Sequence, residues 1–552
     1  MTAAASVGRR GAVALPPWRD VVGGAGHLVA QVGPLASGVV ALGGELTRVV
    51  RGTCELAPGA RDRRFADPAW VDSPLYRRVA QTYLAVDAVL GGLLRGVETS
   101  GASWRTIERA RLARSVIGST LAPTNTLPGN PAALRRAVET GGGSLLRGAR
   151  NVVADVLHNG AMPSQVDARP FVVGRDTAIS PGAVVARDEV AELIQYTPMT
   201  ARVRRRPLVV VPPPIGRYYF LDLRPGRSFV EFALSHGHPV FMISWRNPGP
   251  DQADLGVDDY AARVVSAYET AAAVSGSDDV DTLAFCAGGI LTTATLAHLA
   301  HIGRADLVRS AALAVTLLDF DVPAPIGAFS SPSLLAIAAA RSSVEGVISA
   351  RSLGAVFSWM RPDDLVWSYV VNNYLMGQDP PAFDILAWNA DGTNLPARLH
   401  REFLEVFGEN RLVRPGAVTV LGSPVDLGAV GQPVFVTGAR TDHLTPWSGC
   451  YRTTQHLGGE ATFALSSSGH VASLVNPPGN PRSSFSMGPA EGTAAEWDAA
   501  HSARTGSWWE GWAEWVSTTS PSAERRAPRA LGDDLHPALD PAPGRYVRDL
   551  TA

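Results

Sequence analysis

The chain has 552 residues, of which 46% are hydrophobic and 18% charged; this is a globular composition and exceeds one ordinary domain. Its net charge of −2 disfavours polyanion binding, so we expect no nucleic-acid partner. All 49 basic residues are arginines. The absence of lysine excludes a Walker A phosphate loop, a Schiff-base lysine and a Ser-x-x-Lys acyl enzyme.

The cysteine content and the N-terminal sequence indicate a cytoplasmic protein. There are only three cysteines, at positions 54, 286 and 450, too few and too scattered for a disulfide framework or a metal site. The first residues lack the apolar segment of a signal peptide. The most apolar long stretch, Val21–Leu46, is interrupted by polar residues and proline, so we expect no transmembrane segment.

Residues 1–180 are predicted to form a mostly helical N-terminal domain. Apolar residues recur at spacings of three and four over Leu75–Val97 and Trp104–Ile117, and glycine and proline separate these stretches. Both stretches are therefore expected to be amphipathic helices that pack one face against a core.

Residues 181–525 show a different pattern, in which buried strands alternate with helices. The expected strands are 207–212, 239–245, 280–285, 311–318, 433–437 and 461–465, and the expected helices include 260–274 and 289–300. Continuous β-branched runs are typical of strands that are buried on both faces. The sequence therefore predicts an α/β fold with a doubly wound, mostly parallel sheet.

Two segments depart from this alternation. Residues 322–410 are an insertion of helices and loops between two core strands, with the length of a lid or cap over a site. Residues 526–552, rich in proline, arginine and aspartate, are expected to be an irregular C-terminal tail. Before the tail, four tryptophans lie at helical spacing, and we expect their indoles to pack on the core rather than bind a ligand: Trp508, Trp509, Trp512 and Trp515.

The strongest local signal for chemistry is the segment Leu283–Gly289, in which an apolar strand leads into a small-residue turn and then a helix. This arrangement is typical of the nucleophile elbow of an α/β-hydrolase fold, with Cys286 as nucleophile. Taken alone, a buried cysteine that acts as a small hydrophobic residue is an equally good interpretation.

Two later segments favour the catalytic interpretation. Asp442 lies in the loop after the strand at 433–437, and His470 ends the loop after the strand at 461–465. The chain order of nucleophile, acid and histidine is that of α/β hydrolases. His443 is an alternative base, but it directly follows the acid, so we favour His470.

These groups define a predicted mechanism. His470 would take the proton of the Cys286 thiol, and Asp442 would orient the imidazole and stabilise its cationic form. The backbone N–H of Ala287 would form half of an oxyanion hole. The other half would come from Ile215, in the loop after the strand at 207–212, with Gly216 as the alternative.

A cysteine at the elbow favours acyl transfer. A thiolate exchanges an acyl group with another thioester at nearly equal bond energy, whereas serine would form a more stable oxygen ester. If the insertion excludes water, the acyl group would therefore be transferred rather than hydrolysed.

At this point the sequence resembles the polyhydroxyalkanoate synthases, over about residue 135 to the C-terminus. The resemblance rests on a set of local motifs: His158–Val166, Leu193–Tyr196, Tyr218–Leu223, Ser244–Pro248, Trp359–Asp364, Asn372–Tyr374, Phe383–Leu386, Asp442–His443, Ser468–His470, Asn476–Pro478 and Ala542–Val547. Several of these motifs are more similar to the single-subunit synthases of medium-length side chains. Departures from the family pattern are Ala284, where the family has glycine, and Pro214 with Gly216 in the expected oxyanion loop.

The resemblance implies an α/β-hydrolase core with a lid and a helical N-terminal domain. It implies an acyltransferase that polymerises (R)-3-hydroxyacyl-coenzyme A into a polyester of cytoplasmic granules, with Cys286 as acyl acceptor, His470 as base and Asp442 as its partner. No cofactor is expected, since the coenzyme A thioester is a substrate. A homodimer is also implied, and the N-terminal region could contact granules or granule-coating proteins.

Two alternatives stay open at this stage. An acyl-coenzyme A thioesterase or polyester depolymerase would use the same fold, although cysteine at the elbow argues against it. A granule-binding scaffold with a decayed site would explain Ala284, although the retention of Cys286, Asp442 and His470 argues against it.

Overall fold

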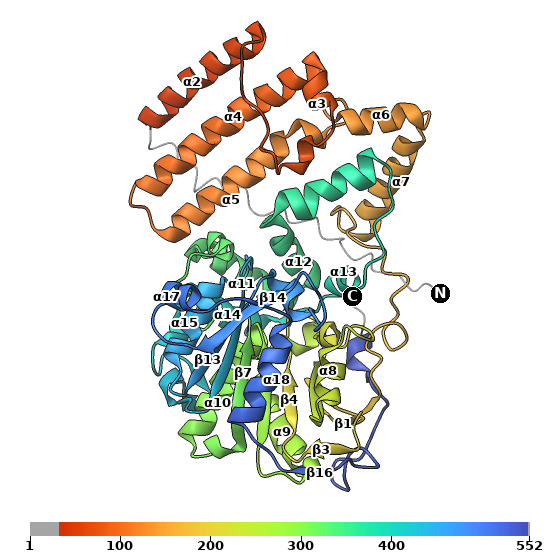
Figure 1. Cartoon of the computed structure of the whole chain (residues 1–552), viewed down its shortest axis with the longest axis vertical. Coiled ribbons are helices and arrows are strands. Elements are labelled where there is room, and N and C mark those ends of the chain that lie inside the picture. Colours follow the sequence, from red (N-terminus) through yellow and green to blue (C-terminus); the bar gives the residue numbers. More distant parts are fainter. Residues whose placement is uncertain (1–31, 550–552) are drawn as a thin grey trace, which may run out of the picture. The chain divides into compact units, whose positions relative to one another are not determined.

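The computed structural model describes residues 32–549 and divides into two compact units, shown in Figure 1. The first unit contains the chain up to residue 167 together with 325–329 and 351–382; the second contains 168–324, 330–350 and the chain from 383 onward. The N-terminal residues considered for a signal peptide, and the first part of Val21–Leu46, lie outside the described residues.

Helices make up most of the first unit: α2 (Val32–Arg51), α3 (Ala69–Asp72), α4 (Pro74–Thr99), α5 (Trp104–Leu121), α6 (Pro131–Glu139), α7 (Gly143–His158) and most of α12 (Ala350–Trp359). The predicted helices over Leu75–Val97 and Trp104–Ile117 are confirmed as α4 and α5. Helix α5 begins where its N-cap predicts, because the Ser103 hydroxyl accepts a hydrogen bond from the Thr106 N–H.

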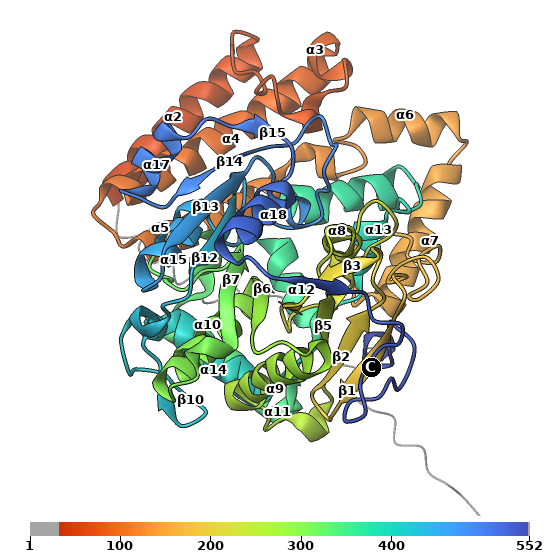
Figure 2. The same cartoon turned by 60° about the horizontal axis from the view of Figure 1, so that its bottom comes forward.

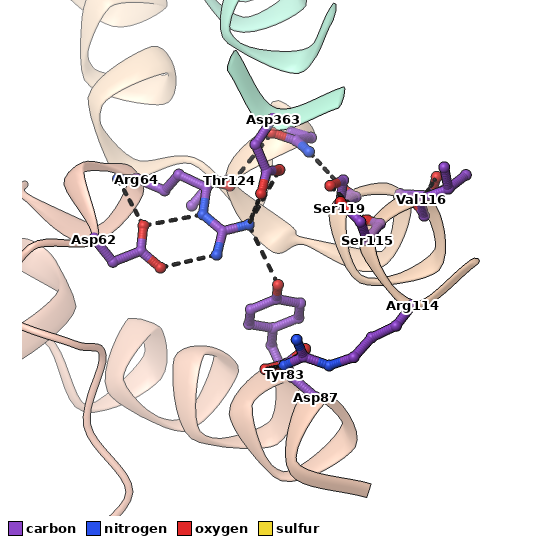
Figure 3. A network of polar contacts seen from close by, with 12 residues as sticks. Asp62, Arg64, Tyr83, Asp87, Arg114, Ser115, Val116, Ser119, Thr124 and Asp363 are labelled. Carbon is purple, nitrogen blue, oxygen red and sulfur yellow. Dashed lines mark hydrogen bonds and ion pairs between the residues drawn. The ribbon is translucent and has the colours of Figure 1, made fainter. Parts of the chain in front are cut away.

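A polar cluster around Arg64 joins the N-terminal helices to residues of the insertion within the first unit (Figure 3). The Arg64 guanidinium pairs with Asp62 at 2.8 Å and with Asp363 at 3.2 Å, and it donates to the Tyr83 hydroxyl at 3.4 Å. Beside this cluster lies a small aromatic core of Phe65, Trp70 and Tyr83. Charge pairing and apolar packing therefore hold Asp363 in this unit.

Helix α7 contacts a second part of the insertion, residues 370–375. A Cβ atom at Gly148 would lie 1.8 Å from the Tyr374 carbonyl oxygen, so only glycine permits this approach. The Tyr374 hydroxyl donates to Asp155 at 2.8 Å, and the Asn151 amide donates to the Asn373 carbonyl at 3.1 Å. The expected insertion of 322–410 is thus shared between the two units.

A large sheet forms the centre of the second unit, in the order β1-β2-β5-β4-β6-β7-β12-β13-β14-β15. Its strands are β1 (Gly182–Arg187), β2 (Ala191–Tyr196), β4 (Leu208–Val211), β5 (Val240–Trp245), β6 (Val280–Phe285), β7 (Val308–Ala314), β12 (Val434–Ala439), β13 (Ala461–Ser466), β14 (Ser484–Pro489) and β15 (Arg504–Thr505). The six predicted strands are the six parallel ones, β4 to β7, β12 and β13, and antiparallel strands extend both edges.

Helices cover both faces of this sheet (Figures 1 and 2). Helices α8 (Phe229–Ser235) and α18 (Trp508–Thr519) share one core with Leu283 and Phe285 of β6. On the opposite face, the hydroxyl of Tyr268 in α9 (Val257–Ser275) contacts Thr282 at 3.0 Å. Trp508, Trp509 and Trp512 of α18 are at most 1% exposed, which confirms the prediction that these indoles pack on the core.

The remaining elements of the chain are shorter or peripheral. The helices are α10 (Ala287–His301), α11 (Pro332–Glu345), α13 (Asp384–Ala390), α14 (Ala397–Glu409), α15 (Trp447–His456), α16 (His470–Leu474) and α17 (Ala494–Ala500). The small strands are β3 (Arg202–Arg204), β8 (Val347–Ile348), β9 (Leu395–Pro396), β10 (Thr419–Val420), β11 (Ser423–Pro424) and β16 (Glu524–Arg526). Over residues 32–549, no helix is long and apolar enough to cross a membrane.

The C-terminal segment is closely docked although it is largely irregular. Val184 of β1 exchanges backbone hydrogen bonds with Leu539 and Asp540, each 2.8 Å long, so the segment covers the outer edge of the sheet. The buried Glu192 carboxylate accepts hydrogen bonds from the Arg545 and Tyr546 N–H groups and pairs with Arg187. One carboxylate thus satisfies donors from two distant parts of the chain.

This arrangement predicts a strong effect of Glu192→Ala. The substitution leaves the Arg187 charge and two backbone N–H groups without their shared acceptor, so unfolding free energy should fall by about 3 kcal/mol. Urea denaturation of both proteins measures the difference. Glu524→Ala is the control, because Glu524 forms an exposed pair with Arg202 and its loss should cost about 0.5 kcal/mol or less. Equal effects of the two substitutions would contradict the prediction.

Candidate active site

Cys286 lies at a sharp turn between the end of β6 and the start of α10. Its φ of +49° and ψ of −121° are unusual for a residue with a side chain. The turn is fixed on both sides, because the Cys286 N–H donates to the Ala314 carbonyl at 2.8 Å and the Gly289 N–H donates to the Cys286 carbonyl at 2.9 Å. The strand–turn–helix geometry is that of a nucleophile elbow.

The two glycines after Cys286 are required by close packing. A Cβ atom at Gly288 would lie 2.5 Å from the Val211 carbonyl oxygen and 2.7 Å from that of Pro212. At Gly289, a Cβ atom would lie 2.1 Å from the Thr316 hydroxyl. Ala284, in contrast, lies inside β6 and is fully buried in the sheet, so its methyl group is outside the turn.

Asp442 lies in the loop after β12, and all its carboxylate contacts come from nearby donors. Oδ1 accepts the N–H groups of Leu444 and Thr445 at 2.8 and 3.0 Å. Oδ2 lies 2.6 Å from His470 Nδ1 and 2.7 Å from the Thr445 hydroxyl. Burial alone would raise the pKa of this carboxyl, but the imidazole and these hydrogen bonds lower it.

His470 is the first residue of α16, after β13, and it is buried. Burial alone would lower its pKa, but the Asp442 carboxylate raises the pKa of His470 to about 10, and the Cys286 sulfur acts in the same direction. A hydrogen bond with Cys286 is among the causes of the raised pKa of His470, so the thiol lies beside the imidazole. Since Nδ1 faces Asp442, Nε2 is the nitrogen left for the thiol.

The structure therefore brings the three predicted residues together in the second unit. His470, and not the alternative His443, is the imidazole that contacts Asp442. Thr445, which contacts both members of the pair, was not among the predicted site residues. A polar residue three positions after the expected acid was the only available signal, and a threonine there is equally typical of the N-terminal turn of a helix.

The two expected oxyanion donors lie on neighbouring elements. Ala287 is the first residue of α10, where backbone N–H groups have no intrahelical acceptor. Ile215 follows β4, which pairs with β6 through Val211 and Ala284. Trp388 donates to the Arg217 carbonyl at 2.7 Å and Thr393 donates to the Pro214 carbonyl at 2.8 Å, which fixes the Ile215 loop from both sides.

Arg217 ties this loop to the C-terminal segment. Its guanidinium is only 2% exposed and pairs with Asp391 at 2.7 Å. It also donates to the carbonyl oxygens of Tyr546, at 3.2 Å, and Asp549. The loop beside the elbow thus depends on residues from the end of the chain.

Two family models match this chain. The family model described as alpha/beta hydrolase fold matches residues 225–477, and the one described as "Poly-beta-hydroxybutyrate polymerase (PhaC) N-terminus" matches residues 61–233. Among solved structures, a monoacylglycerol lipase from Paleococcus ferrophilus is 13% identical with a TM-score of 0.34, and the match covers 60% of this chain and 99% of the lipase. The second unit is an α/β-hydrolase core, as predicted.

Full-length relatives identify the family. Poly(3-hydroxyalkanoate) polymerase 1 of Ectopseudomonas oleovorans is 42% identical over 93% of this chain and 91% of its own length. The poly(3-hydroxyalkanoate) polymerase subunit PhaC of Cupriavidus necator is 38% identical over 91% of this chain and 85% of its own length. The chain belongs to the poly(3-hydroxyalkanoate) polymerases, and the prediction of an acyltransferase of this family is confirmed.

The elbow packing predicts that Gly288→Ala is poorly tolerated. The added methyl group meets backbone oxygens that cannot rotate away, so β4 or α10 must shift, at a cost of about 1–3 kcal/mol. A lower thermal unfolding midpoint together with reduced coenzyme A release would show this. Gly354→Ala in α12 is the control, because a Cβ atom there meets nothing within 4 Å. A Gly288→Ala protein with both properties unchanged would contradict the packing argument.

Proposed function

We propose that this protein polymerises (R)-3-hydroxyacyl-coenzyme A into polyester through a Cys286–His470–Asp442 triad and an acyl-cysteine intermediate. The observation that carries the proposal is the 2.6 Å contact between His470 Nδ1 and Asp442 Oδ2, next to a cysteine at a nucleophile elbow. Family membership supplies the substrate class, and these side chains supply groups suited to acyl transfer.

The first half-reaction charges the enzyme. The Cys286 thiol gives its proton to His470 Nε2, and the thiolate attacks the thioester carbonyl of the substrate. Backbone N–H groups of Ala287 and Ile215 are proposed to stabilise the resulting oxyanion. When the intermediate collapses, the bond to coenzyme A breaks, its sulfur takes the proton from His470, and the acyl group remains on Cys286.

The second half-reaction lengthens the polymer. A hydroxyl group of another hydroxyacyl unit gives its proton to His470 and attacks the acyl-cysteine carbonyl. An oxygen ester forms, the bond to Cys286 breaks, and the returning proton restores the thiol. Replacement of a thioester by a more stable oxygen ester drives the reaction toward polymer, which is the reason to prefer cysteine over serine at this position.

The wider assignments are also proposals, drawn from the family. We propose a homodimer in the cytoplasm at the surface of polyester granules, with the N-terminal region in contact with granules or granule-coating proteins. Residues 322–410 are proposed to exclude water from the acyl enzyme as a lid. A preference for medium-length side chains is proposed from motifs such as the one at His158–Val166.

The direct test is coenzyme A release from (R)-3-hydroxyoctanoyl-coenzyme A and its four-carbon analogue, with analysis of the product. Wild-type enzyme should release coenzyme A and form polymer, with faster release from the eight-carbon substrate. Cys286→Ala should reduce both by at least about a thousandfold, because no other group can hold the acyl chain.

Cys54→Ala is the matched control, because Cys54 is a buried free cysteine in the other unit and its loss should leave polymer formation intact. Stoichiometric release of free hydroxy acid by the wild type would support the thioesterase alternative instead. Absence of coenzyme A release from both substrates would support the scaffold alternative.

A further inference from the structure

Thr445 contacts both members of the buried acid–base pair. Its hydroxyl oxygen lies 2.7 Å from Asp442 Oδ2 and 3.2 Å from His470 Nδ1. All three residues are at most 9% exposed, so water does not readily replace any of these contacts. The hydroxyl therefore belongs to the same hydrogen-bond network as the carboxylate and the imidazole.

The positions of the protons follow from counting donors and acceptors. An ionised carboxylate can only accept, so the 2.6 Å contact between Oδ2 and Nδ1 requires a proton on Nδ1. A protonated Nδ1 cannot accept a hydrogen bond, so the Thr445 hydroxyl must donate to Asp442 Oδ2. Its lone pairs then face the Nδ1–H group, which holds the imidazole in the tautomer that leaves Nε2 free to take the Cys286 proton.

Thr445 also holds the other carboxylate oxygen. Its backbone N–H donates to Asp442 Oδ1 at 3.0 Å, beside the N–H of Leu444. Thr445 thus donates a hydrogen bond to each oxygen of Asp442, which fixes the plane of the carboxylate. Thr445 is itself held in place, because Pro446 directly follows it and α15 begins at Trp447.

We propose that Thr445 is a positioning residue for the acyl-transfer site, whose hydroxyl fixes Asp442 and the His470 tautomer and thereby leaves Nε2 free to take the Cys286 proton. This inference rests on the proposed function, since it assigns Thr445 to the same triad. Thr445 acts through Asp442 and His470 and has no contact of its own with the reacting sulfur in the proposed steps.

The expected effect of losing the Thr445 hydroxyl follows from the way Asp442, His470 and Cys286 act on one another. The Asp442 carboxylate favours the imidazolium form of His470, and the imidazolium stabilises the Cys286 thiolate. Without the Thr445 hydroxyl, Asp442 loses a positional restraint, so its carboxylate holds the Nδ1–H group less well and His470 takes the Cys286 proton less efficiently. The other titratable groups beside the pair are His443, next to Asp442 in the chain, and Cys450 on α15.

The experiment compares Thr445→Val, which keeps the shape and removes the hydroxyl, with Thr445→Ser, which keeps the hydroxyl. Full-length protein is alkylated with iodoacetamide from pH 5 to pH 10, and modification of Cys286 is followed by peptide mass spectrometry. The rate of Cys286 alkylation near neutral pH should fall in Thr445→Val and return toward the wild-type rate in Thr445→Ser. Coenzyme A release should fall about tenfold in kcat with little change in KM, the size of one hydrogen bond to a charged group.

Thr454→Val is the matched control, because it also replaces a buried threonine by valine, here within α15. The Thr454 hydroxyl donates only to the Tyr451 carbonyl of its own helix, at 2.6 Å, and its loss should not move the alkylation profile. An unchanged Thr445→Val profile would overturn the proposal. So would an equal fall in rate in Thr445→Ser, because the lost contact would then be steric.

The two measurements also separate this inference from the proposed function. A lowered alkylation rate in a protein that forms no polymer would sustain the role of Thr445 and refute the polymerase assignment. Polymer formation with identical alkylation profiles and rates in wild type and Thr445→Val would sustain the polymerase assignment and refute the role of Thr445.

Discussion

The close approach of three backbone segments at the elbow is the constraint on which the rest of the site depends. Cys286 holds a positive φ because its N–H group is bonded to Ala314 of β7 and its C=O group to the Gly289 N–H. In addition, Gly288 and Gly289 admit the segments after β4 and β7 to van der Waals contact. The same approach brings the Ile215 loop beside the first turn of α10. Backbone geometry thus sets the places of both the sulfur and the expected oxyanion donors, before any side-chain interaction is considered.

The acid–base pair is governed by desolvation. Burial disfavours both the Asp442 carboxylate and the His470 imidazolium, and each is restored by the other. Besides the imidazole, the Asp442 carboxylate accepts hydrogen bonds from two backbone N–H groups and the Thr445 hydroxyl. Each carboxylate oxygen therefore has two partners within the protein. A buried pair of this kind adds little to stability, so its value lies in orientation: it aims one imidazole nitrogen at one thiol.

Much of the fold could be predicted from sequence, and so could the grouping of Cys286, Asp442 and His470 as the candidate site. Continuous apolar runs marked the six parallel strands, since a strand buried on both faces has no polar side to interrupt the run. The elbow was recognisable because its small residues are a local requirement. Thr445 and the C-terminal segment were not recognisable in this way. A hydroxyl that donates to a carboxylate three residues away leaves no periodic pattern, and neither does a strand edge that is covered by residues about 355 positions later. Likewise, the helical texture of residues 351–382 did not indicate that they pack with the N-terminal helices.

The end of the chain bears on the reaction site through two buried charges. Glu192 fixes the C-terminal segment along β1 and β2, and Arg217 joins the end of that segment to the loop that carries Ile215. Gly544, with φ of +80°, is needed there because a Cβ atom would lie 2.3 Å from the Glu192 carboxylate. Arg217 is nearly inaccessible to water, so its charge needs hydrogen-bond partners within the protein. These partners are Asp391 and two backbone carbonyl groups of the C-terminal segment, which are within reach only when the segment is docked. The irregular tail is therefore part of the scaffold that holds the loop of the expected oxyanion donor Ile215.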